Sequence, residues 1–195
     1  MIADTILLLA AGIFGFFLGR FSVNRISEEN EAEENPEEEQ VQWQKRDRKA
    51  TGMVEKYSVG SPVAGMVVRS NAGENPTVVI RPEGGKLFAP TGGKITRLYP
   101  GGKDMLFTTE FGAEMHISVG EVQDDLLERY YRPRVIQNEV VPKGKLLLEF
   151  DVQGLAAEGE TADVSLRMER YDYDTEVVPT AEGRVKAGED ILKIF

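Results

Sequence analysis

Gly92–Val119, which reads GGKITRLYPGGKDMLFTTEFGAEMHISV, carries the pattern that decides the fold. Three segments in it have the length of a β-strand and are rich in apolar or β-branched residues: Lys94–Leu98, Met105–Thr109 and Met115–Val119. Glycine pairs at Gly92-Gly93 and Gly101-Gly102 separate the strands as turns. The stretch therefore predicts successive short strands.

The same pattern continues over the chain from Tyr57 onward. Further strands are predicted at Val67-Val68, Thr77–Ile80, Lys145–Phe150 and Asp190–Ile194, with turns at Gly84-Gly85, Pro142-Lys143-Gly144 and Lys186-Ala187-Gly188. Helical pattern is confined to Glu121–Glu128 and Leu155–Glu158. Many short strands at this spacing indicate an all-β domain, folded as an antiparallel β-sandwich or barrel.

Two segments of the chain repeat one motif. Val141–Phe150 reads VPKGKLLLEF and Val185–Ile194 reads VKAGEDILKI, so each has a valine, two residues, a glycine and an apolar strand. Small β folds use such a turn where a strand enters a barrel. We therefore expect the repeated motif to have an architectural role in the fold. It is too short to define a repeat family.

The composition excludes several kinds of site. The 195 residues include no cysteine and one histidine, His116, which excludes disulfides, thiol nucleophiles, multi-histidine zinc sites and a two-histidine phosphotransfer relay. No metal and no cofactor are expected. The net charge of -10 argues against nucleic acid as a partner. Eight glutamates lie in Glu28–Glu39 alone, so the remaining chain carries a charge of only about -2.

Residues 1–20 are expected to form a transmembrane anchor. Ile6–Gly19 is an unbroken apolar run, and a helix of nineteen residues reaches roughly 28 Å, enough to cross a bilayer core. Arg20 and Arg25 follow the run and no base precedes it, which predicts a single-pass cell-membrane protein with its N-terminus outside and the β domain in the cytoplasm. A cleaved signal peptide is the alternative, although a basic n-region and an A-x-A-like site are missing. Gly15 and Gly19 form a GxxxG pair that could support a homodimer, but a glycine-rich span can also contain this spacing without that role.

Residues 21–56 are predicted to be an acidic disordered linker. The glutamate run Glu28–Glu39 cannot bury enough apolar surface to order itself and is expected to stay extended. The predicted organisation is thus an anchor over 1–20, this linker over 21–56, and a β domain with a C-terminal extension over 57–195.

Four motifs of the β domain occur in the order found in one known family. They are SPVAG at 61–65, APTGGKI at 89–95, GAEMHISVG at 112–120 and VPKGKLLLEFD at 141–151. With these motifs the domain resembles the glucose-type enzyme IIA domain (EIIA type 1) of the bacterial phosphoenolpyruvate-dependent sugar phosphotransferase system (PTS). The resemblance covers most of residues 57–170. It implies an antiparallel β-sandwich of the glucose-permease IIA type, a duplicated hybrid motif.

The resemblance also implies a chemistry from which this sequence departs. In the family one histidine accepts a phosphoryl group from the histidine phosphocarrier protein and passes it on, while a second histidine supports it. Ser118 stands at the acceptor position and Lys103 at the supporting position, and Gly101 replaces a threonine. The family's Asp-Thr-Val after the acceptor is replaced by Val122-Gln123-Asp124, and a partner-docking loop is shortened to Met66–Arg81.

A serine cannot take over this relay. Its hydroxyl is a weak nucleophile without an adjacent base, and its phosphate is a low-energy ester that cannot be handed onward. His116 lies two residues before Ser118, so both side chains share one face of a strand, and Lys103 is expected nearby. Three interpretations stay open: His116 is a half-buried packing residue, it forms an anion pocket with Lys103 and Ser118, or it accepts phosphate itself.

Three functions are compatible with these residues. The first is a non-catalytic, membrane-tethered enzyme IIA relative that binds a PTS phosphocarrier, a sugar permease or a transport regulator. The second is a working component of PTS sugar uptake that uses His116 as its acceptor. The third is a structural module that dimerises through Gly15 and Gly19.

A weak likeness of His116-Ile117-Ser118 to the H-x-H strand of LytM-type zinc peptidases adds no activity, because one histidine cannot supply both zinc ligands. The run RYYRPR at 129–134 fits either a contact surface or the packing of its tyrosines.

Overall fold

The computed structural model describes residues 54–172 and 174–195. The expected anchor over 1–20 and most of the expected linker, including the glutamate run, lie outside the described residues. Within the described part of the chain, no helix is both long enough and apolar enough to cross a membrane.

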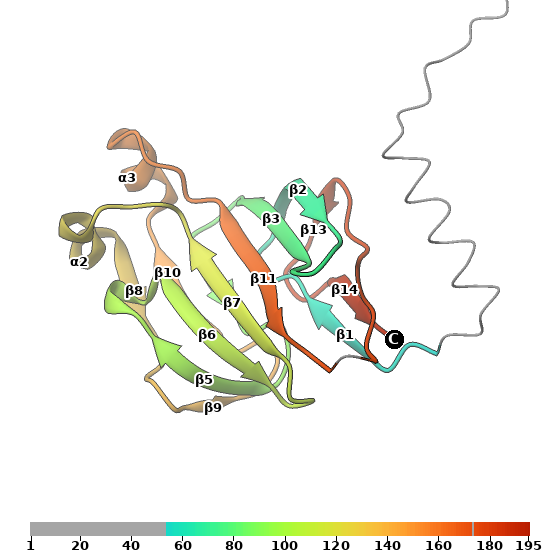
Figure 1. Ribbon diagram of the computed structural model, residues 1–195. Coiled ribbons are helices and arrows are strands. Elements are labelled where there is room, and N and C mark those ends of the chain that lie inside the picture. The colour runs from blue at the N-terminus through green and yellow to red at the C-terminus, as the bar shows by residue number, and fades with distance from the viewer. Residues whose placement is uncertain (1–53, 173) are drawn as a thin grey trace, which may run out of the picture. The chain divides into compact units, whose positions relative to one another are not determined.

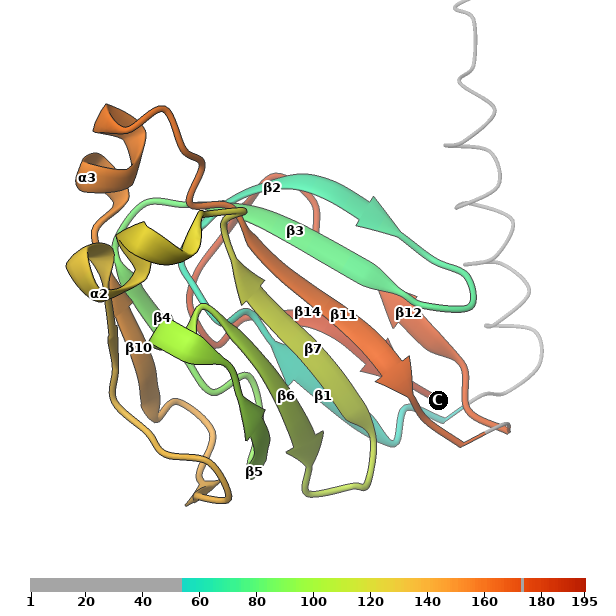
Figure 2. The ribbon, with the colours of Figure 1, turned by 60° about the vertical axis from the view of Figure 1, so that its left-hand side comes forward.

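The largest sheet has eight antiparallel strands in the order β13-β2-β3-β11-β7-β6-β5-β9 (Figures 1 and 2). In chain order their bounds are β2 Gly65–Asn71, β3 Thr77–Pro82, β5 Gly93–Leu98, β6 Asp104–Thr109, β7 Glu114–Val119, β9 Val140–Val141, β11 Val164–Arg170 and β13 Arg184–Val185. The stretch Met66–Arg81, which is shortened relative to the docking loop of the family, is mostly the β2–β3 hairpin.

Two three-stranded antiparallel sheets accompany the large one, in the orders β1-β14-β12 and β4-β10-β8. Their bounds are β1 Tyr57–Gly60, β4 Lys86–Phe88, β8 Tyr131–Pro133, β10 Leu146–Phe150, β12 Val177–Pro179 and β14 Asp190–Ile194. The helices α2, Leu127–Tyr130, and α3, Val152–Ala157, lie together at one end of the domain (Figure 1).

The strand order shows that one arrangement is built twice. The strands β4, β5, β6, β7, β8, β9 and β10 take the same places in the sheets as β1, β2, β3, β11, β12, β13 and β14. The repeated motif predicted from sequence falls at matching corners, before β10 and before β14. There the turn glycines adopt positive φ, +79° at Gly144 and +82° at Gly188, a region that glycine occupies without steric cost.

Matching hydrogen bonds hold the two corners. The Gly144 N–H donates to the Ala89 carbonyl at 2.9 Å, and the Gly188 N–H donates to the Ser61 carbonyl at 2.8 Å. Ala89 and Ser61 begin the APTGGKI and SPVAG motifs. The repeated motif is therefore architectural, as predicted, and the four motifs of the resemblance form these corners and the strand β7.

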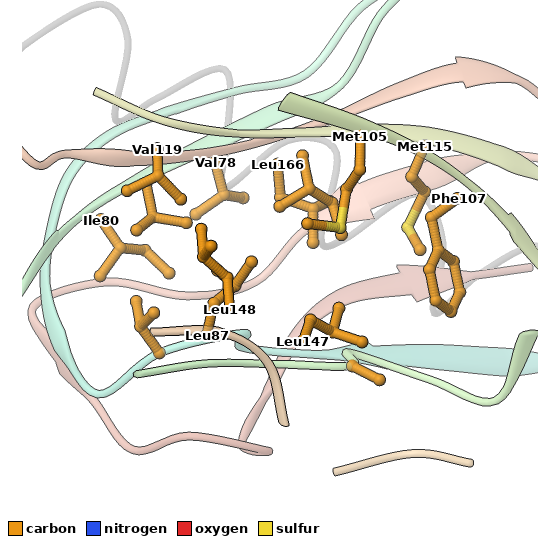
Figure 3. Packing of buried hydrophobic residues seen from close by; sticks show 14 of the residues in the cluster. Val78, Ile80, Leu87, Met105, Phe107, Met115, Val119, Leu147, Leu148 and Leu166 are labelled. Atoms are coloured by element: carbon orange, nitrogen blue, oxygen red, sulfur yellow. The ribbon is translucent and has the colours of Figure 1, made fainter. Parts of the chain in front are cut away.

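The core lies between one face of the large sheet and the two small sheets. Every second side chain of β6 and β7 is buried, which is the alternation expected for a sheet with one covered face. Figure 3 shows Met105, Met115 and Leu166 pointing toward Leu147 and Leu148. All five are completely buried. The opposite face of the large sheet carries polar side chains, and the candidate site lies there.

The predicted strands are confirmed, and the predicted helices need correction. Glu121–Glu128 is helical only from Asp124, as a 3-10 turn over Asp124–Leu126 followed by α2. The second helix, α3, begins before the predicted Leu155 because the carboxylate of Asp151 caps its N-terminus, accepting the Gln153 N–H at 3.1 Å and the Gly154 N–H at 2.9 Å. Sequence analysis missed β11, the central strand beside β7.

Candidate functional site

The polar face of β2, β3, β11, β7 and β6 borders an open cavity of about 1160 Å³. Its lining mixes both signs of charge with hydroxyl and amide groups. All three residues singled out from sequence, Lys103, His116 and Ser118, line this cavity.

Strand register brings these residues together. Ser118 on β7 lies directly opposite Asp104 on β6 and opposite Ser165 on β11. His116, two residues away on the same face, lies opposite Arg167 of β11. The expected common face of His116 and Ser118 is therefore seen, and β11 adds groups that sequence analysis did not consider.

Asp104 is the centre of the cluster. Lys103 Nζ donates to Asp104 Oδ2 at 2.9 Å, and His116 Nε2 lies 3.3 Å from Asp104 Oδ1. The hydrogen bond from His116, together with the hydrogen bond and charge of Lys103, outweighs burial and lowers the pKa of the Asp104 carboxyl. The group is therefore an ionised carboxylate at neutral pH, placed between the Lys103 ammonium and the His116 imidazole of the expected anion pocket.

The other side of the His116 ring also faces a carboxylate. His116 Nδ1 lies 4.0 Å from Glu169 Oε1, and Arg167 Nε donates to the same oxygen at 2.9 Å. Both ring nitrogens are thus next to acidic oxygens. The His116 side chain is 26% exposed, and Asp104 and Glu169 place acidic oxygens on both sides of its ring.

The backbone before β6 explains how Lys103 is positioned. Pro100–Gly102 forms a 3-10 turn with φ of +70° at Gly101 and +75° at Gly102. A Cβ on Gly101 would lie 2.9 Å from Leu127 Cβ, so a threonine does not fit here without movement of α2. The Val119 N–H donates to the Lys103 carbonyl at 2.8 Å, which ties the start of β6 to the end of β7.

The run RYYRPR is largely accounted for by packing beside the site. Tyr130 and Tyr131 are 7% and 2% exposed. The Tyr131 hydroxyl donates to the Val119 carbonyl at 3.0 Å, and burial, reinforced by the charges of Asp104 and Glu160, raises the pKa of Tyr131 to about 12. Arg129 and Arg134 form ion pairs within the domain, with Glu158 and Glu149.

Asp104 was not singled out from the sequence. It directly follows Lys103, and the alternation of DMLFTT places it on the face that Leu106 and Thr108 share. That alternation could have assigned it to the site, because His116 and Ser118 alternate in the same way on the next strand.

Comparison with known proteins now identifies the family. Residues 57–172, more than half of the chain, match the family described as phosphoenolpyruvate-dependent sugar phosphotransferase system, EIIA 1. The chain belongs to this family. The resemblance drawn from its four motifs is thereby confirmed, and the domain is an enzyme IIA-type domain of the PTS.

Two curated relatives are PTS system beta-glucoside-specific EIIBCA components. The one from Halalkalibacterium halodurans is 30% identical over 74% of this chain, and the one from Dickeya chrysanthemi is 30% identical over 73%. In each case the match spans 24% of the relative's length. Among solved structures, glucose permease IIA from Mycoplasma capricolum is similar with a TM-score of 0.62 and 19% identity, covering 71% of this chain and 94% of that one. That likeness shows the enzyme IIA fold.

Proposed function

We propose that this enzyme IIA-type domain does not relay phosphate through a histidine and acts as a membrane-tethered binding and regulatory module of the PTS. One observation carries the proposal: the carboxylate of Asp104 lies between Lys103 and His116 beside Ser118. Lysine and serine at the family's two histidine positions cannot form and support the phosphohistidine that the relay needs. The Lys103 ammonium and the His116 imidazole already face the Asp104 carboxylate within the domain.

His116 as a non-standard acceptor is the second candidate. It is supported by the position of the imidazole on the cavity face, two residues from Ser118. The two carboxylates argue against it. A phosphoryl group on Nε2 would be placed against Asp104, and one on Nδ1 would be placed toward Glu169, so two like charges would come into contact in either case.

Phosphoryl transfer separates the two candidates. The full chain is incubated with enzyme I, the histidine phosphocarrier protein and labelled phosphoenolpyruvate, and an enzyme IIA with both histidines intact serves as the control. We expect no acid-labile, base-stable label on this chain while the control is fully labelled. Such a label, absent from a His116→Gln variant, would show a phosphohistidine and overturn the proposal.

The family and the curated relatives support a proposal for the class of partner. Because those relatives are beta-glucoside-specific components, we propose that the domain binds a sugar permease or a regulator of one, with the phosphocarrier as the alternative partner. Residues 1–20 would anchor the protein in the membrane, and residues 21–56 would link this anchor to the β domain. The β domain over 57–195 would lie in the cytoplasm. Anchoring raises the effective concentration at membrane partners without new contacts.

The anchor is tested by fractionation. We expect the full chain to stay with membranes during an alkaline carbonate wash and a chain lacking residues 1–20 to be released. If Gly15 and Gly19 contribute a homodimer, replacing both by leucine will abolish cross-linking between copies in the membrane but not membrane retention. Release of the full chain by carbonate would refute the anchor.

A further inference from the structure

We propose that Asp104 is itself a phosphoryl acceptor, which takes a phosphoryl group from a phosphohistidine protein and holds it as an acyl phosphate. The inference goes beyond the proposed function, which concerns histidine only. It rests on that function in one respect, namely that PTS membership brings the domain into contact with phosphohistidine donors.

The geometry places the Asp104 carboxylate within reach of the cavity. Its side chain is 23% exposed, and it lines the open cavity. It lies directly opposite Ser118, the family's acceptor position, and directly opposed residues on antiparallel strands have Cβ atoms about 5 Å apart. A donor docked against the family's acceptor position therefore meets this carboxylate on the adjacent strand.

A lysine ammonium, an imidazole and a hydroxyl group lie around the same carboxylate. Lys103 Nζ is 2.9 Å from Oδ2, His116 Nε2 is 3.3 Å from Oδ1, and Ser118 stands on the neighbouring strand. Hydrogen bonds from His116 and Lys103 lower the pKa of the carboxyl, so it is ionised, and an ionised carboxylate oxygen can attack phosphorus. The surrounding groups also offset the repulsion of an incoming phosphate and can donate to its oxygens once it is transferred.

The step balances without a further reactant. An Asp104 carboxylate oxygen attacks the phosphorus of the donor's phosphohistidine, an O–P bond forms, and the N–P bond breaks. The electron pair of that bond stays on the donor's imidazole nitrogen. The product is a mixed anhydride of a carboxylic acid and phosphoric acid. Unlike a serine ester, this anhydride keeps a high transfer potential, so it can be hydrolysed or passed on.

The modification would change the surface that a partner meets. An acyl phosphate adds about one negative charge to the carboxylate it replaces and brings three further oxygens into the cavity. The ion pairs of Lys103 and His116 would move from the carboxylate to the phosphoryl group. The domain thereby becomes a binding module with two states, set by the phosphorylation level of its donor.

The test is made on the unaltered full chain first. The chain is labelled with the enzyme I, phosphocarrier and phosphoenolpyruvate system, and separately with phosphoramidate, a small N–P donor. We expect a label that neutral hydroxylamine removes. Borohydride should reduce the acyl phosphate at residue 104 to homoserine, which mass spectrometry then detects. No label from either donor, with an intact enzyme IIA fully charged in parallel, would overturn this inference and leave the proposed function standing.

Variants then assign the role of each group. Asp104→Asn, which conserves size, should abolish the hydroxylamine-sensitive label, and Lys103→Ala should slow labelling about 10- to 100-fold through loss of one charge-assisted hydrogen bond. Asp163→Asn is the matched control, because Asp163 lines the same cavity, is 25% exposed and forms an ion pair with Arg81. It should label normally. A hydroxylamine-sensitive label that persists in Asp104→Asn would refute Asp104 as the acceptor, and an acid-labile, base-stable label on His116 would refute the proposed function as well.

Discussion

Asp104 contributes to stability in a pH-dependent way, because hydrogen bonds from His116 and Lys103 and the charge of Lys103 favour its ionised form. Its pKa is lower in the folded chain than in the unfolded one, so the contribution is complete above the unfolded pKa and is lost as the pH falls through the folded pKa. We expect Asp104→Asn to lower the free energy of unfolding at pH 7 by about 1 kcal/mol, a value reduced for partial exposure.

Urea unfolding at pH 7, 5 and 3.5 checks this expectation. The difference between Asp104→Asn and the unaltered chain should shrink at pH 3.5, because that pH lies below the unfolded pKa of the carboxyl. Asp163→Asn removes one ion pair with an Arg81 side chain that is 67% exposed, so it should change stability by no more than about 0.5 kcal/mol. An Asp104→Asn effect that is the same at all three pH values would show that the ion pairs contribute nothing.

Only some of the residues of the site could be predicted from the sequence. Motif positions placed Lys103, His116 and Ser118 together, because the motifs fix which residues occupy corresponding strand positions. They did not reveal that Asp104 lies between Lys103 and His116. That arrangement depends on the register of β6 against β7, which pairs Asp104 with Ser118. It also depends on which nearby carboxylate the side chains of Lys103 and His116 contact.

At the scale of single elements, β11 is the most informative strand. Its sequence, VSLRMER, alternates apolar with polar residues, and the apolar positions Val164, Leu166 and Met168 are completely buried. The strand β11 was not predicted from the sequence, because the prediction relied on continuous apolar runs. An alternation of apolar and polar residues also predicts a strand, one with a single covered face. For the same reason Arg167 and Glu169 were not predicted to belong to the site. Glu169 Oε1 accepts a hydrogen bond from Arg167 and lies near His116 Nδ1.

The alternation predicts opposite outcomes for two adjacent substitutions in β11. Leu166→Ala should cost about 2 to 5 kcal/mol, because it opens a cavity in the core between the sheets. Arg167→Ala changes a side chain on the cavity face that is 46% exposed, and it should cost no more than about 0.5 kcal/mol. Chemical unfolding of the two variants measures both values. Equal losses would mean that β11 does not have one covered face and one open face.

At the scale of the whole molecule, the duplicated arrangement makes the C-terminal strands part of the fold. The family match ends at Asp172, yet β14 is the middle strand of the sheet β1-β14-β12, and Tyr57 pairs with Ile194. The first and last strands of the domain therefore depend on each other. The motif repeated in Val141–Phe150 and Val185–Ile194 agrees with this, because the first copy lies inside the family match and the second lies outside it, whereas the sequence alone predicted the last residues only as a C-terminal extension.

Truncation at the end of the family match should therefore unfold the domain. A chain ending at Asp172 loses Ile191, Leu192 and Ile194, which are at most 3% exposed, and burial of each such side chain is worth about 1.5 to 3 kcal/mol. That loss is comparable with the whole stability of an ordinary domain, about 5 to 15 kcal/mol. We expect near-UV circular dichroism and amide NMR dispersion to disappear in the truncated chain. Lys193→Ala, on the outer side of the same strand, should unfold as the intact chain does. A truncated chain that still unfolds cooperatively, with an unchanged midpoint in urea, would show that residues 57–172 fold alone and that β14 is an appendage.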